Sequence, residues 1–260
     1  MQKEEIKFAP SSVFEGMTSI RAIIRSMDEK LSDRKILEIH YDKSKMSKIS
    51  KELGYFKAVK EKYDFEIIAS TSPELDSITT GSSHGGIIAI GSQRTIPSLN
   101  NISDIKKDGF YVMIQGIEDP YNFGYAIRSL YATGVDGIIL PERNWMSAAG
   151  VVCRSSAGAS ELIPMFTADA NDAVIRFKEL GYNIVCAEEK TEYTLGNCDL
   201  PYPIFLIIGG EKRGISRSVL DMADKLVKID YAREFKASLS AASACTMFAY
   251  EIMRQNKKKI

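Results

Sequence analysis

The chain has 260 residues, which is enough for one large or two small domains. Its 34 basic and 34 acidic residues balance, so overall charge does not favour nucleic acid, and such binding must rest on local patches. The four cysteines are scattered and only two histidines are present, which argues against a metal site. The charged run MQKEEIKFAP is unlike a signal peptide, and no window approaches the roughly 20 apolar residues of a membrane helix. We expect a cytoplasmic protein with reduced thiols and no membrane contact.

The first part of the chain predicts a small α/β unit from about residue 14 to residue 92. Apolar alternation and β-branched runs predict strands over 35–41, 65–69 and 84–90. Between the first two strands, apolar residues at helical spacing predict a helix over 45–63. Pro97, two asparagines and several charges then mark residues 93–108 as a linker.

A second unit begins near residue 109, where strand and helix patterns alternate. The predicted strands are 110–115, 137–140, 182–187, 204–208 and 226–229. The predicted helices are 122–133, 146–156, 171–180, 216–224 and 238–255. This alternation predicts a mostly parallel sheet that is covered by helices on both faces.

The turn 117–128 joins the first strand of this unit to its first helix, where open α/β sheets place their ligands. With Pro120, Asn122, Gly124 and Arg128, the turn suits a polar or anionic substrate. It is equally compatible with an ordinary helix start, in which Asp119 and Asn122 can cap the helix, Pro120 stiffens the turn and Arg128 is a solvated side chain.

Two later segments also follow strands. Residues 207–216 carry Gly209 and Gly210, which let a ligand approach the backbone closely, but their spacing fits neither a P-loop nor GxGxxG. The alternative is a loop that starts a helix at Ser216. Residues 229–244 place small side chains at the start of a long helix, where plain helix packing is the favoured interpretation for 241–244.

Together, the three segments resemble the SpoU (TrmH) family of RNA 2′-O-ribose methyltransferases in the SPOUT superfamily. Its motifs have the forms DPxNxGxxxR, GxExxGxS and a strand-end Ile followed by Ser-Leu-Asn-Val-Ser. The matching residues are Asp119, Pro120, Asn122, Gly124 and Arg128, then Gly209, Glu211, Gly214 and Ser216, then Ile229, Ser238 and Leu239. Ser240 and Ala242 depart from the third motif, standing where the family has Asn and Ser. The SAGA run at 156–159 and the run His84-Gly85-Gly86-Ile87 also resemble family segments.

The resemblance implies an α/β chain with three parts. Residues 1–92 would form an L30e-like RNA substrate-binding domain, 93–108 a linker, and 109–260 a SPOUT domain with a parallel sheet and a deep trefoil knot. S-adenosylmethionine would be held by the knotted loops, through Gly209, Gly210, Ile215, Ile229 and Leu239. The family acts as homodimers that meet near the last helix and the first-motif turn. Phe248, Tyr250 and Ile252 would lie either at that interface or in the core.

The implied reaction is methylation of a ribose 2′-hydroxyl in ribosomal or transfer RNA. Arg128 would be central. Because an arginine pKa above about 12 makes it a poor base, we expect it to bind a phosphate and stabilise the developing alkoxide. Asn122 would orient Arg128 or the ribose, and Ser238 or Ser240 would contact the ribose or the cofactor. Glu211 would hold the loop or the arginine, unless it has only a capping role.

Two rival functions follow from the same residues. The first is a catalytically weak or inactive RNA-binding protein that keeps the fold. Ser240 favours it, because a serine is shorter than asparagine and offers one rotating hydroxyl instead of a planar amide, unless the run marks a subgroup with its own arrangement. The presence of Asn122, Arg128 and Glu211 opposes it. The second, a Rossmann-type nucleotide enzyme, is disfavoured because no glycine turn follows the first strand of the second unit.

A lysine-rich run between residues 43 and 62 is the local patch that suits RNA. The candidate RNA contacts are Lys45, Lys48 and Lys51. The alternative is a solvated helix face, which commonly explains such a run.

Overall fold

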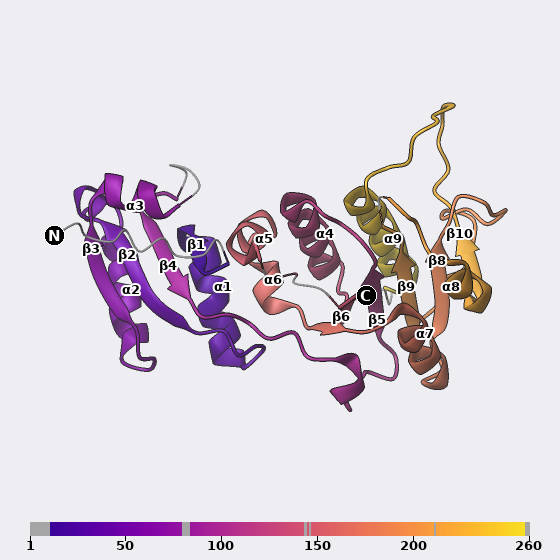
Figure 1. The fold of residues 1–260 in the computed structure, drawn as a ribbon, viewed down its shortest axis with the longest axis horizontal. Helices are drawn as coiled ribbons and strands as arrows, with labels where there is room; N and C mark the ends of the chain where they lie inside the picture. Colours follow the sequence, from indigo (N-terminus) through magenta and orange to yellow (C-terminus); the bar gives the residue numbers. More distant parts are fainter. Residues whose placement is uncertain (1–10, 80–83, 143–144, 146, 211, 258–260) are drawn as a thin grey trace. The chain divides into compact units, whose positions relative to one another are not determined.

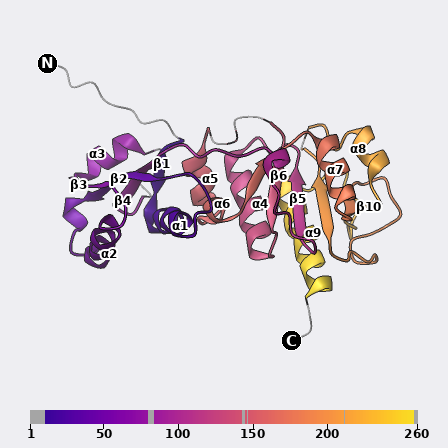
Figure 2. The same cartoon turned by 90° about the horizontal axis from the view of Figure 1, so that it is seen from below.

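The computed structural model describes residues 11–79, 84–142, 145, 147–210 and 212–257, which fold into two compact units (Figures 1 and 2). Unit 1 holds Met1–Thr95 and Asn144–Leu162, and unit 2 holds Ile96–Arg143 and Ile163–Ile260. Strands alternate with helices in both units, so the predicted α/β class is confirmed. Among the helices of the described ranges, none is long and apolar enough to cross a membrane.

Unit 1 is built on a mixed four-stranded sheet with the order β1-β4-β2-β3. Its strands are β1 (Val13–Glu15), β2 (Ile36–Asp42), β3 (Glu66–Ser70) and β4 (Ile87–Gly91). β2 and β3 are parallel, whereas β4 runs antiparallel to β1 and β2. All three predicted strands form, but the last begins at Ile87 because Gly85 and Gly86 make a turn with positive φ.

The helices of unit 1 differ more from the prediction. Its first stretch of chain contains α1 (Gly16–Glu29), α2 (Ser50–Lys60) and α3 (Ser72–Ile78), with a 3₁₀ turn η1 at Lys43–Lys45. The helix predicted over 45–63 is shorter, because its beginning is η1, whose Ser44 amide donates to the buried carboxylate of Asp42 at 2.9 Å. α1 adds to the predicted elements, although its buried Ile20, Ile23 and Ile24 have helical spacing.

Helices α5 (Ala149–Ser155) and α6 (Ala159–Leu162) belong to unit 1, where they pack against α1 and β1. The sequence places the helix over 146–156 in the second unit, and that placement is wrong. A glycine makes the close packing possible. At Gly158, with φ +86°, a Cβ would lie 2.5 Å from the Ala22 Cβ, so a larger residue would push α6 away from α1.

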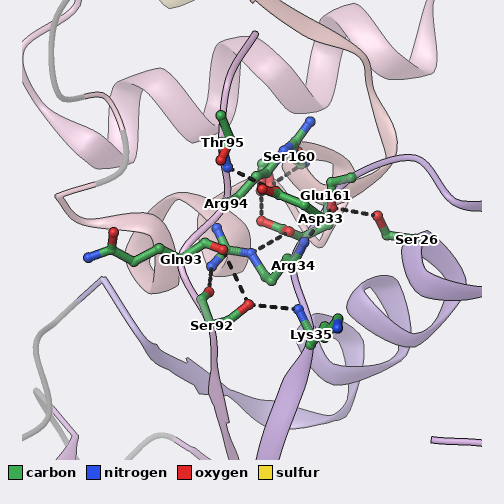
Figure 3. A network of polar contacts seen from close by, with 12 residues as sticks. Ser26, Asp33, Arg34, Lys35, Ser92, Gln93, Arg94, Thr95, Ser160 and Glu161 are labelled. Carbon is green, nitrogen blue, oxygen red and sulfur yellow. Dashed lines mark hydrogen bonds and ion pairs between the residues drawn. The ribbon is translucent and has the colours of Figure 1, made fainter.

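A buried ion pair ties α6 to the rest of unit 1 (Figure 3). Arg34 Nε donates to Glu161 Oε2 at 2.8 Å, and the side chains are 0% and 1% exposed. Arg34 Nη1 donates to the Ser92 carbonyl at 2.6 Å, and its guanidinium lies 4.6 Å from the Phe14 ring centroid. Loss of one partner from such a pair typically costs about 3–5 kcal/mol, so this contact is a main support of α6.

The predicted linker over 93–108 is packed rather than free. Arg94 is buried in unit 1, where it donates to the Ser160 carbonyl. Further along, Leu99 is buried in the core of unit 2, and the Thr167 amide donates to the Pro97 carbonyl at 2.9 Å. The backbone of the predicted linker therefore pairs with the edge strand Met165–Thr167 of the sheet in unit 2.

Unit 2 contains, in its described part, a six-stranded sheet with the order β10-β8-β9-β5-β6-β7. All neighbouring pairs are parallel, as the sequence predicts. The strands are β5 (Phe110–Ile114), β6 (Gly137–Leu140), β7 (Met165–Thr167), β8 (Asn183–Ala187), β9 (Ile204–Ile208) and β10 (Lys225–Val227). Only β7 lacks a predicted counterpart, because a strand of three residues is too short to show a period.

Helices cover both faces of this sheet (Figures 1 and 2). They are α4 (Pro120–Ala132), α7 (Ala170–Glu179), α8 (Arg217–Met222) and α9 (Ala241–Asn256). Met113 shares one core cluster with Phe177 of α7 and Val219 of α8, while its two neighbours in β5, Val112 and Ile114, are buried on the opposite face of the sheet. α4 and α9 pack against each other. The trefoil knot and the L30e-like shape of unit 1 stay predictions.

Candidate functional site

A cavity of about 540 Å³ opens at the carboxyl ends of β8, β9 and β10 in unit 2. Its walls come from four segments, namely 187–189 at the end of β8, 208–210 with 212–215 at the end of β9, 227–231 at the end of β10, and 238–248 at the start of α9. Open parallel sheets bind ligands at this edge, where strand ends and helix starts meet. The second and third sequence segments therefore enclose one cavity.

The residues that the sequence assigns to a cofactor all line this cavity. They are Gly209, Gly210, Ile215, Ile229 and Leu239. Ser238 and Ser240, which the sequence assigns to catalysis, line it as well. Positions about 30 residues apart are thus brought together because β9 and β10 both end at this edge of the sheet.

The glycines of the second segment serve the packing of the backbone. A Cβ at Gly209 would lie 2.8 Å from the Gly214 carbonyl carbon, and one at Gly210 would lie 3.2 Å from the Gly116 Cα. The Gly214 amide donates to the Gly210 carbonyl at 2.9 Å, closing a tight loop. The sequence predicts close approach of a ligand, whereas the structure shows close approach of chain to chain in a loop that lines the cavity.

The third segment is fixed by two hydrogen bonds. Ser240 is the N-cap of α9, where its Oγ accepts from the Ser243 amide at 3.2 Å. The Leu239 amide donates to the Tyr231 Oη at 3.1 Å. Ser240 therefore has a helix-capping role, in addition to facing the cavity.

The first segment lies beside this cavity rather than in its wall. Asp119 caps α4 by accepting from the Asn122 amide at 3.0 Å, and neither Asn122 nor Arg128 is among the lining residues. Arg128 is exposed, and its side chain makes no ion pair or hydrogen bond with the described residues. Its neighbour Ser129 accepts from Thr246 of α9 at 2.8 Å, which links α4 to the helix that starts at the cavity.

Glu211, the remaining catalytic candidate, lies outside the described residues. The adjacent Lys212 is exposed and donates to Glu118 of the first segment at 2.7 Å. This contact joins the first segment to the second across the surface of unit 2.

A second cavity, of about 850 Å³, lies on the other side of the second-segment loop. It shares Gly210, Lys212 and Gly214 with the first cavity. Its other polar lining residues are Ser98, Asn100, Gln115, Glu118, Glu142, Asp169, Asp172, Arg213 and Ser216. The loop therefore separates a mixed apolar and polar cavity from one that is rich in carboxylates.

Sequence reasoning did not single out Glu188, Glu189 or Tyr231, although all three line the first cavity. A signal for the two glutamates was present, because they directly follow the predicted strand 182–187 and the carboxyl end of a parallel strand faces the site. Tyr231 carried no comparable signal, since its position depends on the path of an irregular segment.

Two buried cysteines lie in elements that form this cavity, one in β8 and one in α9. Burial raises the pKa of Cys186 and of Cys245 to about 12, so both thiols are neutral near pH 7. Within the described ranges, no group of three or more His, Cys, Asp or Glu side chains is placed to hold a metal ion.

Of the lysine candidates for RNA contact in unit 1, Lys45 ends η1, Lys48 lies in the turn before α2 and Lys51 lies in the first turn of α2. Lys48 and Lys51 are exposed and make no ion pair with described residues, whereas the Lys45 Nζ lies 3.7 Å from Asp42 Oδ2. Lys62, at the far end of the run, is paired with Asp28. Lys43, Lys57 and Lys60 are likewise exposed without an ion pair to described residues, so the unpaired cations are spread along the run rather than gathered at one point.

A parallel sheet with helices on both faces and a ligand-sized cavity at its carboxyl edge defines an open α/β protein of the ligand-binding type. The chain belongs to the SpoU rRNA Methylase family, whose family model matches residues 109–250.

Individual relatives agree with this assignment. A Staphylococcus haemolyticus protein named for the TrmH tRNA/rRNA methyltransferase family is 29% identical over 197 residues, which cover 73% of this chain and 78% of the relative. The SpoU methyltransferase AviRb from Streptomyces viridochromogenes, solved in complex with AdoMet, has a TM-score of 0.74 at 24% identity, covering 94% of this chain and 89% of AviRb. An RNA 2′-O ribose methyltransferase has a TM-score of 0.73 at 18% identity, with 94% and 88% covered. These structural likenesses show the fold.

Proposed function

We propose that this protein transfers a methyl group from S-adenosylmethionine to a ribose 2′-hydroxyl in ribosomal or transfer RNA. The observation that carries the proposal is the cavity of about 540 Å³ whose walls are supplied by the second and third motifs. Family membership supports RNA methylation. The AdoMet complex of AviRb supports the cofactor, and the fold relative that is a 2′-O ribose methyltransferase supports the acceptor atom.

The lining residues fit S-adenosylmethionine. Ile215, Leu239 and Phe248 offer apolar surface for an adenine ring, and the Glu188 carboxylate suits ribose hydroxyls or an ammonium group. We assign the holding of the cofactor to Gly209, Gly210, Ile215, Ile229 and Leu239. When bound, the cofactor would supply a methyl group activated by a positively charged sulfur.

The acceptor side of the reaction is assigned to the first motif. The Arg128 guanidinium is exposed and suits bidentate contact with a phosphate next to the acceptor ribose. Its positive charge would stabilise the alkoxide that develops as the hydroxyl loses its proton. Asn122 would orient Arg128 or the ribose, while Ser238 and Ser240 would contact the ribose at the cavity edge.

We propose a homodimer that forms through the outer face of α4 and α9. Tyr121, Tyr125 and Arg128 follow helical spacing on α4, and Tyr250 lies on α9; the three tyrosines are 52%, 52% and 57% exposed. Phe248 and Ile252 of α9 are 1% and 0% exposed, so they belong to the core. A second copy on this face would bring its own Arg128 toward α9, whose first turns line the cavity.

Unit 1 is proposed to bind the RNA substrate through the exposed lysines at the start of α2. Charge reversal of Lys48 and Lys51 is expected to weaken RNA binding at low salt and to flatten its salt dependence, because each phosphate contact releases counterions. If the charge-reversed variant binds RNA at low salt as tightly as the parent protein, these lysines are only a solvated surface.

The proposed function is tested with radiolabelled S-adenosylmethionine and separate pools of ribosomal and transfer RNA from cells that lack the protein. We expect label in one pool, at a linkage that resists alkaline hydrolysis because the 2′-oxygen is blocked. Label only on bases would contradict the ribose assignment. Transfer to neither pool, with the cofactor bound, would contradict the enzyme assignment.

Ser240 supports a second candidate function, an RNA-binding protein with little or no turnover. Its hydroxyl is engaged with Ser243 as a helix cap, and it stands where the family motif has an amide. Ser240→Asn separates the two candidates. A gain of transfer from an inactive starting protein would identify Ser240 as the cause of inactivity.

A further inference from the structure

The segment between β10 and α9 carries two exposed aromatic rings that the proposed mechanism does not use. Residues 230–238 are exposed throughout and form the golden loop that projects beyond β10 and α9 in Figure 1. Tyr231 and Phe235 in this loop are 38% and 58% exposed. Their ring centroids are 5.9 Å apart, and their planes meet at 67°. Single exposed apolar residues are common, but a paired set of rings on a polar loop is unusual.

The pair is fixed at the mouth of the first cavity. Tyr231 is one of the lining residues, and its Oη accepts from the Leu239 amide, which belongs to the cavity wall. Phe235 packs against Tyr231 edge to face and lies on the solvent side, since it is the more exposed of the two. The rings therefore extend the wall of the cavity outward into solvent.

Cations accompany the two rings. Arg233 and Lys236 are exposed and make no ion pair with any described residue, and Lys228 lines the cavity below them. Asp230 and Glu234 oppose these charges only in part. Flat π surfaces interleaved with cations suit an unstacked nucleotide, because the base stacks on a ring while the phosphates meet the charges.

We propose that Tyr231 and Phe235 are a stacking platform for the base of the acceptor nucleotide, and that Arg233 and Lys236 contact its flanking phosphates. This inference rests on the proposed function, because a methyl acceptor must reach the mouth of the cavity that holds the donor. Stacking does not read the identity of the base, so the platform binds the nucleotide class as a whole. It gives unit 2 an RNA contact of its own.

The test uses the full chain and fragmented ribosomal RNA of mixed sequence, with binding measured at low salt and S-adenosylmethionine affinity measured in parallel. Phe235→Ala is expected to weaken RNA binding about tenfold, since one stacked base contributes about that factor. Phe235→Trp should retain binding, whereas Phe235→Leu should not, because leucine is apolar but has no π face. Cofactor affinity should stay within about twofold in every variant, because Phe235 does not line the cavity.

Leu180→Ala is the matched control. Leu180 is 46% exposed and precedes β8, so it lies at the opposite edge of the sheet from the cavity. Ultraviolet crosslinking of the same RNA should label the peptide that contains Tyr231 and Phe235. Equal RNA affinity of all variants, or crosslinks confined to unit 1, would overturn the proposal. A changed assembly mass in Phe235→Ala without a change in RNA binding would instead assign the rings to a second copy of the chain.

The outcomes separate this inference from the proposed function. RNA binding that depends on Phe235, without methyl transfer by the unaltered protein, would keep the platform and reject the enzyme. Methyl transfer with an unchanged KM for RNA in Phe235→Ala would keep the enzyme and reject the platform.

Discussion

The largest fully buried side chain of unit 1 is an arginine, whereas the central strands of unit 2 are apolar along their length. In unit 1, Arg34 and Glu161 are paired inside the fold and join segments that are 127 positions apart. In unit 2, a set of charged side chains lines the two cavities at the carboxyl edge of the sheet, among them Glu188, Lys228 and Asp169. Buried charge in unit 1 holds separate pieces of chain together, while edge charge in unit 2 is available for ligands.

The largest expected effect on stability tests this role of buried charge. Glu161→Ala leaves the Arg34 guanidinium buried without its carboxylate, so we expect unit 1 to lose about 3–5 kcal/mol of unfolding free energy. Trp145, the single tryptophan of the chain, belongs to the same unit and reports its unfolding by fluorescence in denaturant.

A double variant serves as the control for the ion pair. Arg34→Met with Glu161→Leu replaces both charges with apolar side chains of similar size, and such replacements are often neutral or stabilising. Recovery of most of the lost stability would support a role in joining segments. If Glu161→Ala unfolds at the same denaturant concentration as the parent protein, the pair contributes little.

The largest expected effect on activity concerns an exposed charge of unit 2, the guanidinium of Arg128. Arg128→Ala is expected to lower the rate of methyl transfer about 100–1000-fold, because the variant lacks the positive charge that would stabilise the developing alkoxide. Cofactor affinity should be nearly unchanged, since Arg128 does not line the cavity. Single-turnover transfer and equilibrium binding of S-adenosylmethionine measure the two quantities.

Arg217→Ala is the matched control for Arg128, because Arg217 is exposed on α8 and, among the residues that the structure describes, forms its ion pair with Asp221 of the same helix. Its transfer rate should equal that of the parent protein. Near-normal turnover in Arg128→Ala would remove this arginine from the mechanism.

A smaller effect is expected from the packing between α6 and α1. Gly158→Ala would put a methyl group 2.5 Å from the Ala22 Cβ, and such overpacking costs roughly 1–3 kcal/mol. Gly134→Ala, at φ +82° with no atom within 4 Å of the new Cβ, carries only the backbone strain of about 1–2 kcal/mol. The Trp145 signal should shift in the first variant and not in the second. Equal Trp145 transitions would mean that α6 is loosely held.

The sheet of unit 2 was largely predictable from sequence, because buried parallel strands are continuous apolar runs. Residues 204–208 are a case in which the predicted and observed bounds agree. The attachment of α5 and α6 to unit 1 was not predictable, since it depends on a pairing between Arg34 and Glu161 that leaves no local pattern.

The candidate site shows the same division. Gly209, Ile229 and Leu239 were named from the resemblance of their motifs to the SpoU family, and they line one cavity because β9 and β10 end at one edge of the sheet. Tyr231 was missed, because only the path of an irregular segment and one hydrogen bond from the Leu239 amide place its ring at the mouth. Local patterns are legible in one sequence, whereas contacts made by irregular backbone are not.

The smallest expected effect is a pH dependence that belongs to unit 1. Hydrogen bonds from Ser72 and Ser44 lower the pKa of the buried Asp42 carboxyl to about 2, from an ordinary value of 3.8. The folded state therefore binds this proton less readily than the unfolded state. The stabilisation by Asp42 is fully present above about 3.8 and is lost as pH falls from there toward about 2.

Acid titration followed by Trp145 fluorescence measures this effect. Asp42→Asn should be less stable at pH 6 and should show a weaker dependence of stability on pH between about 4 and about 2, because an amide does not titrate there. Asp64→Asn, at an exposed position of the same unit, should follow the parent protein. If the parent protein and Asp42→Asn lose the same stability between about pH 4 and about pH 2, the carboxylate does not stabilise η1 and α3. The polar interior of unit 1 would then depend on the Arg34–Glu161 pair rather than on a wider set of buried charges.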